Sequence, residues 1–202
     1  MKKILLLVAL IAISSVAFSQ DYKVEIEKTF NEYSALMDTK DFQKIMDYMP
    51  VEIFEIILKD LMVKNLEDAY NDTTILLEVK RPKILEIGKL EKIKGKYYSI
   101  FSSSVQMNIT IKAEEKEKFD EEEKDEDNPT LKEILLAMYQ KIYGKENVSY
   151  NESTQTFEIQ SIQKTIAISE NGISGWKFMN ADKGLETLLE KILPKKILKS
   201  AL

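Results

Sequence analysis

The stretch from Ile162 to Met179 constrains the fold of this chain more than any other part of the sequence. It contains two β-prone runs on either side of Asn171-Gly172. These two residue types tolerate the positive φ angles that a type I′ turn requires at both central positions. The stretch therefore predicts a β-hairpin with a two-residue turn.

A two-residue turn also determines which side chains share each face of the hairpin. It places Ala167 opposite Trp176, and Thr165 opposite Phe178, on one face. The other face carries four apolar residues, Ile162, Ile166, Ile168 and Met179. Because both faces are apolar, we expect the hairpin to lie in a sheet that is covered on both sides, the second side by the C-terminal helices or by a second subunit.

The first nineteen residues have the pattern of a secretory signal peptide. Lys2 and Lys3 precede an apolar run over residues 4–13, and residues 17–19 have the small-x-small pattern of a cleavage site. The alternative is a membrane anchor, but Ser14-Ser15 interrupts the run before the roughly 20 apolar residues that span a bilayer. We expect residues 1–19 to be removed, with no membrane anchor left, and residues 20–202 to form one exported domain, periplasmic or secreted.

Composition excludes several classes of function. The chain has no cysteine and no histidine, so disulfides, thiol catalysis, histidine-based triads and the usual zinc or copper sites are excluded. We expect no metal and no cofactor. The formal charge of −5 becomes −7 when Lys2 and Lys3 leave with the signal peptide, which disfavours nucleic acid as a partner.

Apolar residues at helical spacing occupy the region that follows the signal peptide. They predict helices over residues 22–38 and 42–49. A third helix is expected over residues 50–69, starting at Pro50 and interrupted near Lys59-Asp60.

From Thr73 the hydrophobic period changes to two, which predicts strands. The expected strands cover residues 74–80, 83–91 and 96–112. Arg81-Pro82 is expected to end the first strand, and a turn at Gly95 to join the other two.

Residues 114–127 contain ten carboxylates and three lysines. They are interpreted as a solvated loop, with a calcium site as the alternative. A helix over residues 129–143 should follow, with a capping box formed by Thr130 and Glu133. Its predicted apolar face consists of Leu131, Ile134, Leu135, Met138 and Ile142. Strands over residues 148–150 and 155–160 then lead into the hairpin, and two helices separated by Pro194 end the chain.

Helices followed by long strands, in a chain of this size, resemble the NTF2-like superfamily. That resemblance implies an α+β fold with N-terminal helices packed in a strongly curved antiparallel sheet, here with an inserted helix and C-terminal helices. Several short segments also resemble small exported Bacteroidota proteins of unknown function. These segments are residues 40–42, 45–48, 83–88, 143–148, 176–178 and 192–194.

The resemblance does not select one activity, because the superfamily includes enzymes, ligand binders and interaction modules. Isomerase-like members use a carboxylate base inside the cone. In this chain Glu86 is the weak candidate for that catalytic base. The alternative interpretation is that Glu86 is an exposed strand residue with no catalytic role. Five aromatic residues could line a pocket for a ligand or could simply be core. They are Tyr33, Tyr97, Phe101, Trp176 and Phe178.

The leading hypothesis is an exported non-catalytic domain that binds a small apolar ligand or a protein partner in the cell envelope, as a monomer or a homodimer. The alternatives are a carboxylate-and-tyrosine enzyme of the isomerase or dehydratase type, and a purely structural interaction module. Trp176 should face small residues, Ala167 on the hairpin and Ser99 and Ser103 on the long strand, which could leave room for an apolar ligand.

Overall fold

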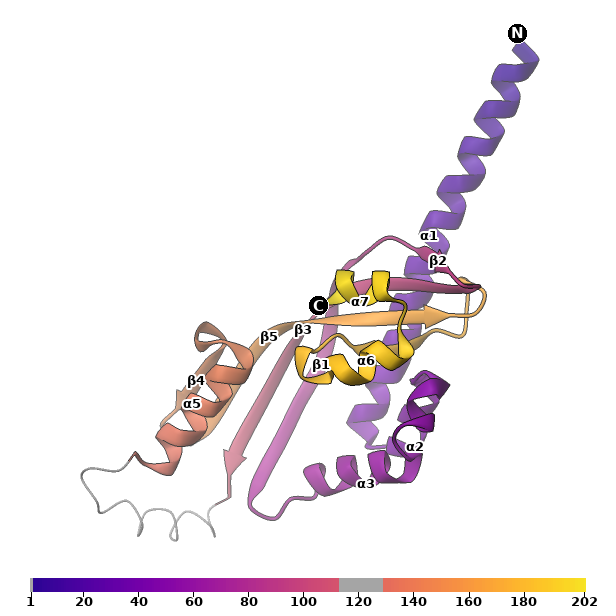
Figure 1. Cartoon of the computed structure of the whole chain (residues 1–202). Coiled ribbons are helices and arrows are strands. Elements are labelled where there is room, and N and C mark those ends of the chain that lie inside the picture. Colours follow the sequence, from indigo (N-terminus) through magenta and orange to yellow (C-terminus); the bar gives the residue numbers. More distant parts are fainter. Residues whose placement is uncertain (1, 113–128) are drawn as a thin grey trace. The chain divides into compact units, whose positions relative to one another are not determined.

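The computed structural model describes residues 2–112 and 129–202, with side chains from residue 21 onward (Figure 1). The predicted loop over residues 114–127 lies outside the described residues. The fold is α+β, with an open six-stranded antiparallel sheet. Its main strand order is β1-β3-β5-β4, with β2 paired to β3 and β6 paired to β5.

The strands are β1 (Ile75–Ile87), β2 (Glu91–Ile93), β3 (Lys96–Ile111), β4 (Val148–Asn151), β5 (Thr156–Ser169) and β6 (Lys177–Asn180). The α-helices are α1 (Lys2–Thr39), α2 (Phe42–Ile45), α3 (Lys59–Tyr70), α5 (Leu131–Tyr143), α6 (Glu186–Ile192) and α7 (Lys195–Ala201). The short 3-10 helices are η1 (Met46–Tyr48), η2 (Val51–Glu55), η3 (Lys145–Asn147) and η4 (Lys183–Leu185).

The chain forms two compact units. The first comprises Met1–Leu58, Ile84–Ser102 and Lys164–Leu202, and the second comprises Lys59–Lys83 and Ser103–Gln163. Strands β1, β3 and β5 each contribute residues to both units.

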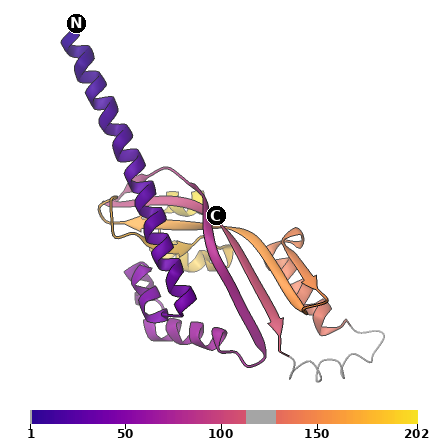
Figure 2. The same cartoon turned by 180° about the vertical axis from the view of Figure 1, so that it is seen from behind.

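In the first unit, α1 packs against one face of the sheet. Tyr22, Ile26 and Phe30, spaced four residues apart on one side of the helix, are all buried there. They form one core cluster with Ile87, Phe101, Ala167, Trp176 and Phe178. Figures 1 and 2 show α1 on one side of this part of the sheet and α6 and α7 on the other.

The second face of the hairpin strands is also buried in the first unit, as predicted. Ile166, Ile168 and Met179 are buried, and so are Leu189 of α6 and Ile197 of α7. Ile162 was expected on the same covered face, but it is 70% exposed. Residue 162 belongs to the part of β5 in the second unit, whereas α6 and α7 belong to the first unit.

The predicted register of the hairpin is wrong by two residues. Ala167 pairs with Phe178 rather than Trp176, and Thr165 pairs with Asn180, so the loop is longer than a two-residue turn. Because the shift is even, every side chain keeps its predicted face, and Trp176 and Phe178 both remain in the core.

Side-chain hydrogen bonds within the loop favour the longer connection. The Asn171 Oδ1 accepts from the backbone N–H groups of Ile173 and Ser174, at 2.8 and 2.9 Å. The Ser169 hydroxyl donates to the carbonyl oxygen of Ser174 at 2.7 Å and accepts from the N–H of Gly172 at 3.0 Å. These bonds satisfy loop backbone groups that a tight turn would have left to the strand ladder.

Several predicted boundaries also differ from the structure. The predicted strands over residues 74–80 and 83–91 form one strand, β1, which continues through Pro82. β1 is at the end of the main strand order, and an edge strand tolerates a residue without an N–H group. Helix α1 begins at Lys2 rather than Tyr22, because residues 2–39 contain no glycine or proline that would end a helix.

Other local predictions are confirmed. The interruption in the third predicted helix appears as the gap between η2, which ends at Glu55, and α3, which begins at Lys59. The first part of that predicted helix is a 3-10 helix rather than an α-helix. Pro194 precedes α7, and the long strand after Gly95 extends from Lys96 to Ile111.

In the second unit, α5 packs against a separate core cluster of Ile109, Val148, Phe157 and Ile159. The capping box is confirmed, since Thr130 Oγ1 accepts from the N–H of Glu133 and the Glu133 carboxylate accepts from the N–H of Thr130. The predicted apolar face of α5 is partly wrong. The side chains of α5 that pack on the cluster are Leu135, Leu136, Tyr139 and Tyr143.

Candidate functional site

The structure brings the five predicted aromatic residues into one cluster in the first unit. Phe101, Trp176 and Phe178 are buried core residues, and Tyr33 and Tyr97 are partly buried against them. The Phe178 ring lies 5.8 Å from that of Tyr33 and 5.9 Å from that of Phe101, centroid to centroid. The rings therefore contact one another as core residues do.

Ser99, one of two buried serines on β3, has a structural partner in this cluster. The carbonyl oxygen of Gly88 accepts hydrogen bonds from the Tyr22 hydroxyl at 3.0 Å and from the Ser99 hydroxyl at 3.1 Å. Ser99 is thus used to satisfy a backbone group beside Tyr22. Gly88 itself is required here, because a Cβ would lie 2.6 Å from the carbonyl oxygen of Ile100.

One polar atom of the cluster stands out. The Trp176 side chain is 1% exposed, and its indole Nε1 has no hydrogen-bond acceptor in the described part of the chain. A buried N–H without an acceptor destabilises the folded state by about 1–3 kcal/mol. Trp176 is buried, as the sequence predicted. Its predicted strand partner Ala167 pairs with Phe178 instead.

The weak catalytic candidate does not point into the core. Glu86 lies on the edge strand β1 and is exposed, as the alternative interpretation expected. Among the described residues, no group of three or more acidic side chains is arranged to hold a metal ion.

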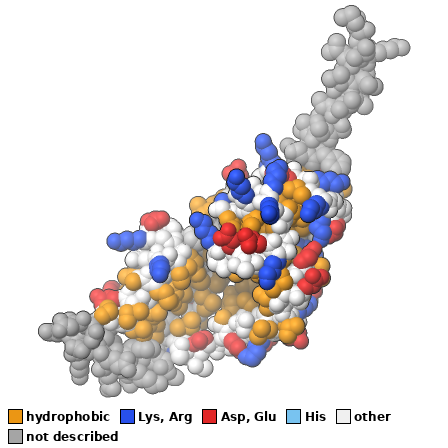
Figure 3. Space-filling view, in the orientation of Figure 1, with side chains coloured by type: hydrophobic (Ala, Val, Ile, Leu, Met, Phe, Trp, Pro, Cys, Tyr) orange, Lys and Arg blue, Asp and Glu red, His pale blue; other side chains and the backbone are white. Residues whose placement is uncertain are grey.

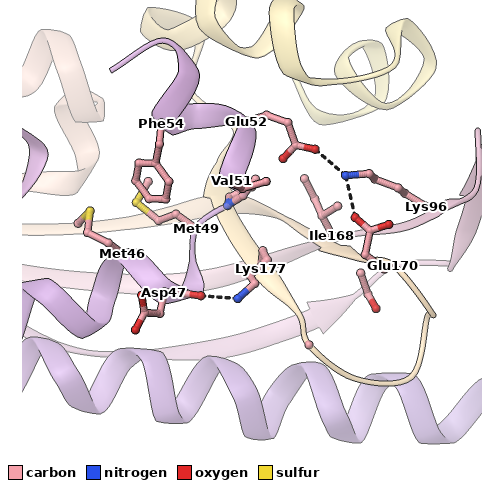
Figure 4. Close-up of a pocket in the computed structure, with 13 residues that line it drawn as sticks. Met46, Asp47, Met49, Val51, Glu52, Phe54, Lys96, Ile168, Glu170 and Lys177 are labelled. Atoms are coloured by element: carbon pink, nitrogen blue, oxygen red, sulfur yellow. Dashed lines mark hydrogen bonds and ion pairs between the residues drawn. The ribbon is translucent and has the colours of Figure 1, made fainter. Parts of the chain in front are cut away.

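A separate pocket of about 360 Å³ lies beside the aromatic cluster in the first unit (Figure 4). Three segments form it: the turns from Met46 to Phe54, the start of β3 at Lys96, and the β5–β6 connection from Ile168 to Lys177. Its apolar side chains include Met46, Met49, Val51, Phe54 and Ile168. Its volume falls in the range of about 300–1,000 Å³ that is typical of small-molecule sites.

Charged side chains of the pocket gather around Lys96. The Lys96 ammonium lies 2.5 Å from a carboxylate oxygen of Glu52 and 2.7 Å from one of Glu170. Hydrogen bonds to Glu170 and Glu52 raise the pKa of Lys96, and the bond from Lys96 lowers the pKa of Glu52. Lys96 and Glu52 are therefore both charged near neutral pH.

A second lysine supports the wall formed by η1. The Lys177 ammonium donates to the backbone carbonyl oxygen of Asp47, and this bond joins β6 to η1. Figure 4 shows the side chains of Met46, Met49 and Phe54 near one end of the pocket and the Lys96 group near the other. The pocket thus combines an apolar part with a charged part.

Sequence reasoning missed this pocket, because its residues come from segments far apart in the chain. The turns after Pro50 are apolar nearly all round, at Ile53, Ile56 and Ile57, but these three residues do not line the pocket, so this pattern did not identify it. In the structure Ile53 is buried, while Val51 is 67% exposed at the pocket.

No protein-family model, curated protein or solved structure matches this chain. None of the described helices is both long and apolar enough to cross a membrane.

Proposed function

We propose that this protein is an exported, non-catalytic domain that binds a small and mainly apolar ligand, and that the ligand occupies the pocket beside Lys96. The observation that carries this proposal is the pocket itself, with an apolar part next to a charged part in one compact unit. A ligand with an apolar body and a polar end matches both parts.

The chemistry of the lining supports ligand binding. Met49 is half-buried and has a flexible, polarisable side chain, which adapts to apolar molecules of different shape. Val51 is largely exposed, so an apolar ligand that covers it gains stability from burial at about 25 cal/mol per Å². Lys96 and Lys177 can donate hydrogen bonds to oxygen atoms at the polar end of the ligand.

A binding role is favoured over the isomerase-type enzyme. Such an enzyme needs an inward, desolvated carboxylate near a hydroxyl donor, whereas Glu86 is exposed. At the pocket, the carboxylate of Glu52 pairs with Lys96, which lowers the pKa of Glu52 and makes it a weak base, and Glu170 pairs with the same ammonium. The NTF2-like fold remains part of the proposal, supported by the packing of α1 against one face of the sheet.

The test uses the single tryptophan as a reporter. Trp176 lies between Gly175 and Lys177, both of which line the pocket. Titration of residues 20–202 with a panel of fatty acids, sterols and other lipophiles should change the Trp176 emission in a saturable way for at least one compound.

A matched pair of variants assigns the binding to the pocket. Val51→Glu places a carboxylate at the apolar part and should weaken binding at least about tenfold. Val24→Glu makes the same change at a valine of α1 that is 64% exposed and outside this pocket, and binding should be unchanged. Equal loss in both variants, or no response to any lipophile, would contradict the proposed function.

A further inference from the structure

The outer face of α5 in the second unit carries an apolar ridge. None of the residues of α5 is fully buried, although the helix is rich in apolar side chains. Ile134, Met138 and Ile142 are 50%, 43% and 61% exposed. Their spacing of four residues aligns them along one side of the helix, and Figure 3 shows hydrophobic side chains gathered over this helix. We call these three residues the α5 ridge.

The ridge adds nothing to the core of its own unit. Leu135, Leu136 and Tyr139 already provide the contacts of α5 with the core cluster. Three large exposed apolar side chains in a row lower the solubility of the protein and make no packing contacts that would stabilise the unit. A surface of this kind is typical of a site that another protein surface covers.

Charges beside the ridge indicate what covers it. A parallel row of exposed residues contains Glu133 in the first turn, Ala137 in the middle and Lys141 in the last turn. When two copies of one helix pair in antiparallel orientation, such a flanking row faces the same row of the second copy. Glu133 of each copy then lies opposite Lys141 of the other copy, and the two Ala137 residues meet between these two pairs.

The apolar residues obey the same symmetry. A twofold axis near Met138 brings the two Met138 side chains together and places Ile134 opposite Ile142 of the other copy. The small Ala137 side chains beside the axis allow close approach of the helices, and the antiparallel helix dipoles also attract. A hydrogen bond from the backbone N–H of Thr130 lowers the pKa of Glu133, so its carboxylate is ionised for this pairing.

We propose that a second copy of this chain binds along the α5 ridge and forms a symmetric, antiparallel α5–α5 dimer. A single helix pair buries little surface, so the dimer is weak and depends on protein concentration. This association is independent of the pocket in the first unit, and it holds whether or not a ligand binds there.

Analytical ultracentrifugation of residues 20–202 over a wide concentration range is the primary test. The wild type should show a reversible monomer–dimer equilibrium. Met138→Lys places two like charges at the twofold axis and should raise the dimer dissociation constant at least about tenfold. Leu76→Lys makes the same change at a 49% exposed residue of β1 in the same unit, and it should dimerise like the wild type.

Charge variants test the orientation of the two helices. Lys141→Glu places Glu133 opposite a carboxylate and should weaken the dimer. Adding Glu133→Gln to that variant removes the repulsion and keeps the capping box, so it should restore part of the affinity.

Cross-linking provides a second measurement, because the natural chain has no cysteine. Ala137→Cys should form a disulfide-linked dimer under mild oxidation, since a disulfide needs Cα atoms within about 7 Å. Thr154→Cys, another exposed position in the same unit, should stay monomeric. A wild type that is monomeric at every concentration, or a Met138→Lys variant that dimerises normally, overturns the proposal.

Discussion

The connection between β5 and β6 offers a sharp test of the packing in the first unit. Gly172 and Gly175 both lie in this loop with positive φ angles, +74° and +66°. They differ in their surroundings. A Cβ on Gly172 would lie 2.7 Å from Cδ1 and 2.8 Å from Cγ of the Tyr97 ring, whereas a Cβ on Gly175 meets nothing within 4 Å.

Because of this difference, alanine substitutions at the two glycines separate two contributions to the free energy of unfolding: backbone strain and a steric clash. At Gly175 alanine has only the left-handed backbone cost, about 1 kcal/mol of unfolding free energy. At Gly172 alanine has the same backbone cost plus the displacement of Tyr97, which adds about 1–3 kcal/mol, as overpacking does. We therefore expect Gly172→Ala to lower the free energy of unfolding by about 2–4 kcal/mol and Gly175→Ala by about 1 kcal/mol.

The measurement is urea unfolding followed by the emission of Trp176, which lies at the end of the same loop. The double variant Tyr97→Ala with Gly172→Ala is the control, since without the ring the extra cost of Gly172→Ala should disappear. Equal losses for the two glycine variants, or a cost of Gly172→Ala that stays above the backbone cost of about 1 kcal/mol when Tyr97 is absent, would refute the described contact between loop and ring.

Four further outcomes are expected. Lys96→Met should lower the free energy of unfolding by about 1 kcal/mol or less at neutral pH, since the partners of Lys96 are partly exposed. The folded-state pKa of Glu52 is lowered, so this stabilisation is present above the ordinary glutamate pKa of 4.5 and is lost as pH falls through the folded pKa; a difference that grew on acidification would contradict this reasoning. Trp176 should give blue-shifted emission in the native state, and red-shifted emission would show that its 1% exposure is wrong. Thr130→Ala should lower the free energy of unfolding by about 1 kcal/mol and reduce the helix content measured by circular dichroism, because it removes the cap of α5. Thr130→Ser keeps the cap and should change neither quantity. Mass spectrometry of the exported chain should find residues 1–19 removed, and their retention would disprove the signal peptide.

Features that depend on neighbouring residues were predictable from the sequence. The capping box of Thr130 and Glu133 joins groups three residues apart, so the local sequence alone determines it. The turn at Gly95 and the interruption before Lys59 are equally local. The helix over residues 22–38 was predicted for a related reason: the spacing of Ile26, Phe30 and Tyr33 places these side chains on one side of a helix, where they join the core cluster.

Features that depend on the partner of an element were decided only by the tertiary structure. Pro82 does not end β1, because β1 is an edge strand, and the sequence of β1 does not contain that information. The buried face of α5 was mispredicted because both of its sides are apolar, and only contact with the second core cluster selects Leu135 and Tyr139 over Ile134 and Met138.

The candidate site belongs to this second group. The five aromatic residues could be placed together, because strand periodicity and helix spacing assign each of them to a core face. The pocket could not be predicted, since it forms where the turns after α2, the start of β3 and the loop after β5 meet. Two of the carboxylates there, Glu52 and Glu170, acquire their shared partner Lys96 only through folding, because ion pairing depends on distance in space and not on separation along the chain.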